Sequence, residues 1–206
     1  MKAGGGRNKG NTFERRVASL VVEAFCDLGV GNKDCYRTPS SGGHKYAKKE
    51  DPGDLVISPK LRKLFPFHVE CKHYKRVELF PLWMLGSNAY KKSWKFKLWM
   101  EQATRACGYV KKKPGALSPM VVFKANGNSP IMCLLPEKSM RSFPAVRLRF
   151  IHLGEVWYAT RFDALLKVLV RSCRRQLGNY GFQRGTESTV TRVIARISMG
   201  TITFYM

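Results

Sequence analysis

The chain has 206 residues, of which 44% are hydrophobic; this suits one compact domain, or one domain with an appendage, and excludes an intrinsically disordered protein. Its 37 Lys and Arg residues against 14 Asp and Glu residues give a formal net charge of +23, which favours nucleic acid as the partner. The longest unbroken apolar run, residues 79–85, contains Pro81 and is too short to span a bilayer, so we expect no membrane partner.

The N-terminal region is basic and rich in glycine, and it lacks the apolar stretch of a secretory signal, so we expect a cytoplasmic protein. Residues 1–10 are predicted to form a flexible basic arm. Asn11 or Thr12 then offers an N-cap for a helix that runs to about Asp27. Glu14 lies on the flank of the apolar stripe of this helix. The stripe consists of residues at helical spacing: Phe13, Val17, Leu20, Val21, Ala24 and Leu28.

Residues 36–51 are polar and rich in glycine, which predicts a mobile loop. Two short β-favouring runs follow, at residues 55–57 and 65–69, and a Ser-Pro dipeptide and a basic turn separate them. This pattern predicts a hairpin with Asp54 at its entry and Glu70 leaving on the partner strand.

A second amphipathic helix is predicted over residues 94–110, with Gln102 at the edge of its apolar stripe. A strand follows at residues 120–123. The order helix, two strands, helix, strand indicates an α/β fold in which a mixed sheet carries helices on its faces. Further elements are predicted as strands at residues 131–135, 146–151 and 156–159 and as a third helix from Phe162.

The six cysteines are never closer than nine residues, so no pair has the spacing of a structural zinc site or a redox motif. They are predicted to be small core residues. DNA binding through a zinc finger is thereby disfavoured, which leaves the folded basic surface as the site of contact.

The segment Glu70-Cys71-Lys72 ends an apolar run. If residues 67–73 form a strand, Glu70 and Lys72 share one face and Cys71 lies on the other. Asp54 and Glu70 are hard oxygen ligands of the kind that Mg²⁺ prefers. An isolated acid-x-lysine is more often a surface ion pair, but charges on a buried strand are costly unless they are paired or bind metal. Lys72 could then orient or deprotonate a water that attacks a phosphate.

The order of five motifs resembles the PD-(D/E)xK nuclease superfamily and, within it, the archaeal, bacterial and phage Holliday-junction resolvases. The motifs span residues 7–126: Lys9-Gly10 with Glu14, Ser40-Ser41-Gly42, Gly53-Asp54, Glu70-Cys71-Lys72, and Gln102. The resemblance implies a restriction-endonuclease-like fold, a mixed central β-sheet flanked by helices, with a nuclease core at residues 11–126. Residues 127–206 would form a C-terminal α+β extension packed on or continuing this core. The acid follows Gly rather than Pro, which departs from the superfamily's literal name but agrees with its resolvase branch.

The resemblance also implies roles for individual residues, with Mg²⁺ as the cofactor and Mn²⁺ as its substitute. The implied catalytic residues are Asp54, Glu70, Lys72, Glu14, Gln102 and Ser41. The implied metal ligands are Asp54, Glu70, the backbone carbonyl of Cys71, and Glu14, directly or through water. The implied DNA contacts are Arg7, Lys9, Ser40, His44, Lys45, Lys48, Lys75 and Arg76.

Structural alternatives exist for several of these residues. Asn11-x-x-Glu14 also resembles a capping box, and a carboxylate near a helix start is favoured by the helix dipole. Gln102 could be an ordinary polar residue on a helix flank, and the Ser-Ser-Gly-Gly loop an ordinary turn. Tyr74 and other aromatic residues among the basic clusters could stack on unpaired bases, although burial is the commoner fate of such side chains.

We therefore predict a metal-dependent, structure-selective DNA endonuclease, a Holliday-junction resolvase acting on branched DNA without a nucleotide cofactor in a bacterial, archaeal or phage-infected cell. A four-way junction needs two cuts, which favours a C2 homodimer; the apolar residues 79–85 are a candidate contact surface. Two alternatives remain. One is a restriction-type, nicking or flap endonuclease on the same fold, and the other is a non-catalytic basic DNA-binding protein.

Overall fold

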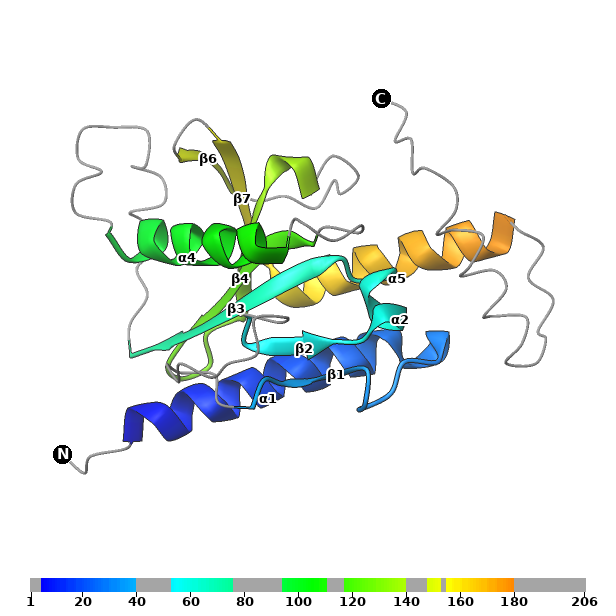
Figure 1. Cartoon of the computed structure of the whole chain (residues 1–206), viewed down its shortest axis with the longest axis horizontal. Helices are drawn as coiled ribbons and strands as arrows, with labels where there is room; N and C mark the ends of the chain where they lie inside the picture. Colours follow the sequence, from blue (N-terminus) through cyan, green and yellow to red (C-terminus); the bar gives the residue numbers. More distant parts are fainter. Residues whose placement is uncertain are drawn as a thin grey trace.

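The computed structural model describes residues 5–39, 53–75, 94–110, 117–139, 148–152 and 155–179, which form a mixed α/β fold (Figure 1). Its helices are α1 (Gly5–Phe25), α2 (Pro59–Arg62), α4 (Trp94–Val110) and α5 (Phe162–Asn179). Single 3-10 turns cover Cys26–Leu28 and Glu137–Ser139. The strands are β1 (Cys35–Arg37), β2 (Leu55–Ile57), β3 (Phe67–Tyr74), β4 (Ser118–Ala125), β5 (Met132–Pro136), β6 (Leu148–His152) and β7 (Glu155–Arg161).

The central sheet has five strands in the order β3-β4-β5-β7-β6. β3 and β4 run parallel, with Glu70 opposite Val121, and all the other neighbours are antiparallel. A parallel pair requires a crossover connection, and α4 lies in the connection between these two strands. β3 stands at the end of the strand order, so its outer edge has no strand partner within the described ranges. β1 and β2 form a separate antiparallel pair.

Two apolar cores lie on the two faces of the sheet. Val69 and Cys71 of β3 point into the first core, which α1, α2 and α5 complete. α4 covers the opposite face, where Trp99 and Met100 pack against alternate residues of β4 such as Val121. Figure 1 shows this layering, with α4 on one side of the sheet and α1 and α5 on the other. Because the residues of β3 alternate, Glu70 and Lys72 point to the face that carries α4.

Several predicted elements agree with the structure. The helix at residues 94–110 coincides with α4, and the predicted helix from Phe162 is α5. The strands predicted after residue 119 correspond to β4, β5, β6 and β7. β5, β7 and β6 continue the sheet that begins with β3 and β4, so the proposed division after residue 126 falls inside one sheet.

The predicted start of the first helix is wrong, because α1 begins at Gly5 and residues 5–10 are helical rather than part of a flexible arm. Neither predicted N-cap acts as one. Thr12 Oγ1 donates to the Asn8 carbonyl inside the helix, and Asn11 Oδ1 accepts a hydrogen bond from Arg37. The Lys9 ammonium bonds to Asn126, so tertiary contacts stabilise turns that their glycines alone would disfavour.

The predicted hairpin is also wrong. β2 pairs with β1, and β3 pairs with β4. The intervening residues form α2, which Ser58 caps by accepting from the Leu61 amide and which Pro59 starts. The first five residues of β3 are all buried, a pattern typical of a strand covered on both faces. Tyr36, which we placed in the loop, lies in β1.

Five cysteines are buried, as predicted, but Cys26 is exposed, and all six are free thiols. None of the helices in the described ranges is long and apolar enough to cross a membrane. Some predictions lie outside the described residues: the loop at residues 40–51, the apolar run at residues 79–85, and the last residues from 180 onward.

Candidate active site

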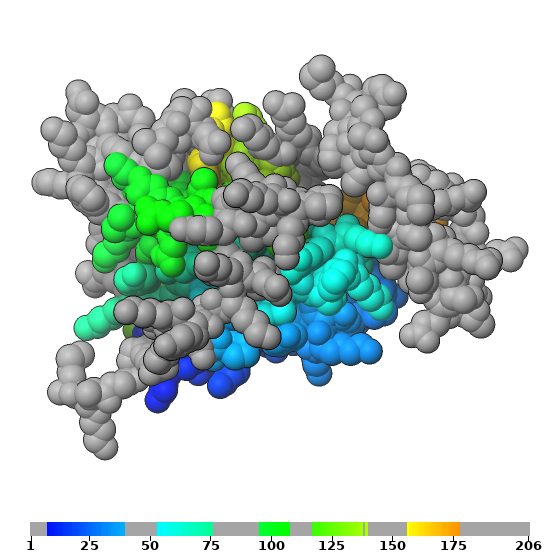
Figure 2. Space-filling model, viewed as in Figure 1, coloured from blue at the N-terminus to red at the C-terminus, as the bar shows by residue number. Residues whose placement is uncertain are grey.

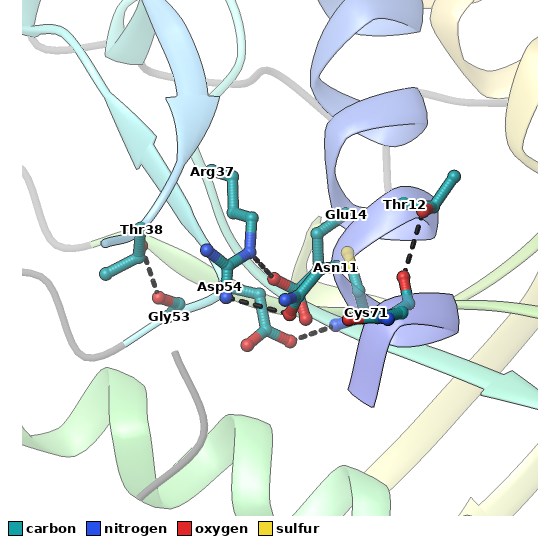
Figure 3. Close-up of polar contacts among 9 residues, drawn as sticks. Asn11, Thr12, Glu14, Arg37, Thr38, Gly53, Asp54 and Cys71 are labelled. Carbon is teal, nitrogen blue, oxygen red and sulfur yellow. Dashed lines mark hydrogen bonds and ion pairs between the residues drawn. The ribbon is translucent and has the colours of Figure 1, made fainter. Parts of the chain in front are cut away.

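The outer edge of β3 carries the first part of the candidate site. The Asp54 amide donates to the Val69 carbonyl at 3.0 Å, and the Cys71 amide donates to Asp54 Oδ2 at 2.7 Å. Thr38 holds the same segment from the other side, because its hydroxyl donates to the Gly53 carbonyl and its amide to the Asp54 carbonyl. The Asp54 carboxylate is therefore fixed against the backbone of β3 (Figure 3).

Glu70, Lys72 and Gln102 meet on the α4 face of β3. Lys72 Nζ lies 2.7 Å from Glu70 Oε1 and 2.9 Å from Gln102 Oε1. Gln102 Nε2 donates to the same Glu70 oxygen at 2.6 Å. The side chains at i and i+2 of the strand thus share one face, and α4 brings the amide that connects them. On the drawn face of the molecule, α4 (green) lies beside residues 53–75 (cyan), with α1 (blue) below them (Figure 2).

Glu14 reaches the site from α1. Its carboxylate is buried and accepts from Arg37 Nε at 2.6 Å, while Arg37 Nη2 donates to Asn11 Oδ1 at 2.9 Å. Figure 3 shows the hydrogen bonds that join Arg37 of β1 to Glu14 and Asn11 of α1. Arg37 is not among the residues predicted from the sequence, because no periodic pattern relates a short strand to a preceding helix. A role for Glu14 as a metal ligand stays a prediction.

Negative charge dominates the buried part of this site. Burial raises the pKa of Asp54 to about 7, and repulsion from Glu70 and Glu14 adds to the increase. The pKa of Glu70 is raised as well, first by burial and then by Glu14, although Lys72 opposes the change. A bound cation would relieve this repulsion, so the donor set fits a hard divalent ion.

Two carboxylates and one carbonyl make up the candidate cation site. In the part of the chain that the structure describes, no group of three or more His, Cys, Asp or Glu side chains is arranged to hold a metal ion. The Cys71 amide faces the outer edge of β3, and the carbonyl of the same residue in a strand points the same way. Asp54, Glu70 and the Cys71 carbonyl are therefore the candidate donors at β3, and Glu14 stays the predicted further ligand.

His68 is a second residue that sequence reasoning missed. It lies two residues before Glu70 on the same face of β3 and is only 3% exposed. A Cβ at position 53 would lie 2.6 Å from His68 Cε1 and 3.0 Å from the Val69 carbonyl oxygen, so only glycine fits there. Burial, with the nearby charge of Arg62, lowers the pKa of His68 to about 4, so the ring is neutral at pH 7. This contact explains why Gly precedes the acid.

The predicted DNA contacts are only partly placed. Lys9 bonds to Asn126, and Lys75 is exposed directly after β3. Arg7 lies in α1, where only its backbone is described. The remaining predicted contacts, and the predicted catalytic serine, lie outside the described residues: Ser40, Ser41, His44, Lys45, Lys48 and Arg76.

The model of the family described as "Phage putative PDDEXK endonuclease" matches residues 5–159, which include every described residue of the candidate site. No curated protein and no solved structure matches the chain.

We expect Gly53→Ala to destabilise the fold by about 1–3 kcal/mol, because its Cβ overlaps the His68 ring and the β3 backbone. The double variant with His68→Ala should lose less than the sum of the two single changes, by at least about 0.5 kcal/mol. Urea unfolding measures all three. Gly31→Ala is the control, since a Cβ there meets nothing within 4 Å. Additive losses at positions 53 and 68 would contradict the proposed contact.

We expect Asp54→Asn to raise the melting temperature at pH 8 in the presence of a chelator. The pKa of Asp54 is raised from 3.8 to about 7 in the fold, so the folded protein binds more protons than the unfolded chain between these values. Its stability therefore falls as pH rises through this window. The gain from the substitution should vanish near pH 4. Asp27→Asn, at an exposed carboxylate, is the control, and an equal gain at both pH values would contradict the explanation.

Proposed function

The chain belongs to this phage PDDEXK endonuclease family, and from that premise we propose that it hydrolyses phosphodiester bonds of branched DNA with Mg²⁺ at the outer edge of β3. The observation that carries the proposal is the position of Asp54 at the outer edge of β3, where it bonds to Cys71 between Glu70 and Lys72, the two residues that meet Gln102 on the α4 face. The net charge of +23 supports a polyanionic substrate.

We propose that Asp54, Glu70 and the Cys71 carbonyl hold the ion, with Glu14 as a further ligand directly or through water. When bound, a divalent cation stabilises the charge that develops on the phosphoryl oxygens. Mn²⁺ offers the same preference for oxygen ligands and should substitute for Mg²⁺.

Lys72 has the role of orienting the attacking water and of stabilising developing negative charge on the phosphate. Its ammonium is held by Glu70 and Gln102, so its position is fixed before substrate binds. Gln102 bonds to both Lys72 and Glu70 and so holds the two side chains in place relative to each other. Arg37 pairs with Glu14, whose charge acts on Asp54, and so balances part of the negative charge.

We propose a four-way junction as the substrate, on the strength of the resolvase-like order of the sequence motifs. A junction of near two-fold symmetry requires two cuts, which a C2 homodimer supplies with two identical sites. Restriction-type, nicking and flap endonucleases share such a metal site and differ in the surfaces around it. They remain the alternatives that substrate preference must separate.

Metal-dependent cutting tests the catalytic assignment. Purified protein should cleave labelled DNA with Mg²⁺ and not with a chelator. Asp54→Asn should lower the rate by about a hundredfold or more, and Lys72→Arg should do so too although it keeps the charge. Both should bind DNA, by fluorescence anisotropy, within about threefold of the wild type if their loss is chemical. Lys167→Ala, an exposed cation on α5, is the control. Cleavage that persists in the Asp54→Asn protein would refute the site.

Comparing a four-way junction with a linear duplex of the same sequence tests the substrate. We expect the junction to be cut at least about tenfold faster, the difference that 1.4 kcal/mol of discrimination gives. Equal rates on both DNAs would favour a restriction-type enzyme.

The mass of the protein in solution tests the homodimer. Light scattering at micromolar concentration should give twice the 23.5 kDa mass of the chain. A monomeric mass would contradict the homodimer.

A further inference from the structure

Tyr74 ends β3 on the same face as Glu70 and Lys72. It lies two positions after Lys72, a distance of roughly 7 Å along the strand. Its side chain is 36% exposed, and the hydrogen-bonded group at Lys72 does not include it. An aromatic ring therefore lies at the surface beside the residue proposed to contact the cut phosphate.

The Tyr74 ring is the outer member of an aromatic cluster. Its centroid lies 5.0 Å from that of Trp99, with 34° between the ring planes. Trp99 is 4% exposed and packs against Phe96 and Phe123, which are both buried. The position of the exposed ring is thus set by a rigid core. A flat, preformed surface of this kind suits another planar ring.

Cations surround the same end of β3. Lys95 Nζ of α4 lies 5.4 Å from the centroid of the Tyr74 ring. Lys75 follows directly in sequence, and Lys124 lies opposite His73 on β4. Lys9 and Lys124 both act electrostatically on His73, which packs against Phe13 of α1, so they lie near this end of the strand by the face opposite Tyr74. Aromatic side chains interleaved with cations are the combination that binds unpaired nucleotides through their bases and phosphates.

We propose that Tyr74, supported by Trp99, binds the unpaired base next to the cut phosphate and that Lys95 contacts the phosphate of that nucleotide. In a paired duplex the two faces of each base are covered by its neighbours, so this contact forms only where stacking is interrupted, as at a flap or the crossing point of a junction. Tyr74 would then select branched over linear DNA. The inference rests on the proposed function and names the substrate feature that its site reads.

Fluorescence of 2-aminopurine tests this contact without cleavage. The probe is placed at the first unpaired position of a flap DNA, and the protein carries Asp54→Asn so that the DNA stays intact. Binding should quench the probe, and additional Tyr74→Phe should retain the quenching because the ring remains. Tyr74→Ala should abolish it and weaken flap binding about tenfold, while linear duplex binding changes less than about twofold. Tyr36→Ala, which removes another exposed tyrosine, is the matched control.

Three results would overturn the inference: quenching that persists with Tyr74→Ala, equal effects of the Tyr74 and Tyr36 variants, or an equal loss of flap and duplex binding by a Tyr74→Ala protein with wild-type circular dichroism. If Tyr74→Ala does not fold, Lys95→Ala decides. It should reduce the salt dependence of flap binding by about one phosphate contact and Lys167→Ala should not, so identical slopes would refute the contact.

Binding and cleavage report on different claims. A wild-type protein that cuts no DNA in Mg²⁺, while Tyr74→Ala still loses quenching, would end the proposed function and leave the base contact standing. If the wild-type protein cuts DNA normally but Tyr74→Ala changes neither quenching nor flap binding, the base contact is refuted and the proposed function stands.

Discussion

The hydrogen bond from the Cys71 amide to the Asp54 carboxylate determines the geometry of the candidate site. Among the described strands β3 pairs on one side only, so the amides and carbonyls that point to its outer edge have no strand partner there. Asp54 bonds to two of these groups: its amide donates to the Val69 carbonyl, and its carboxylate accepts from the Cys71 amide. Because Glu70 adjoins Cys71 in the strand, the relative position of the two acids is fixed by strand geometry rather than by a loop.

The acids at this edge are costly for the folded state. The chain has only 14 acidic residues, yet Glu14 of α1, Asp54 just before β2 and Glu70 of β3 come together in a low-dielectric setting. Burial, and then repulsion from Glu70 and Glu14, raises the pKa of Asp54, and the opposing charge of Lys72 does not cancel this increase. Local destabilisation of this kind is expected where a site is built for a ligand rather than for stability.

The site was predictable where a local rule was sufficient. Strand alternation places Glu70 and Lys72 on one face, and the amphipathic stripe of α4 sets its bounds and carries Gln102 to that face. The predicted hairpin is wrong because local propensity does not determine the partner of a buried strand, and β3 pairs with β4. The early start of α1 and the role of Arg37 depend on contacts between residues far apart in sequence, such as Arg37 with Asn11, and no local pattern contains them.

The glycine before Asp54 shows how such a contact replaces a local restraint. Proline at this position would restrict the backbone by its ring, whereas glycine leaves it free and costs more entropy to order. Here three neighbours supply the restraint: the Thr38 hydroxyl on the Gly53 carbonyl, the Val69 carbonyl on the Asp54 amide, and the His68 ring against the Gly53 backbone. His68 needs the space that a Cβ at position 53 would fill. The two residues therefore depend on each other, and the position of the acid depends on both.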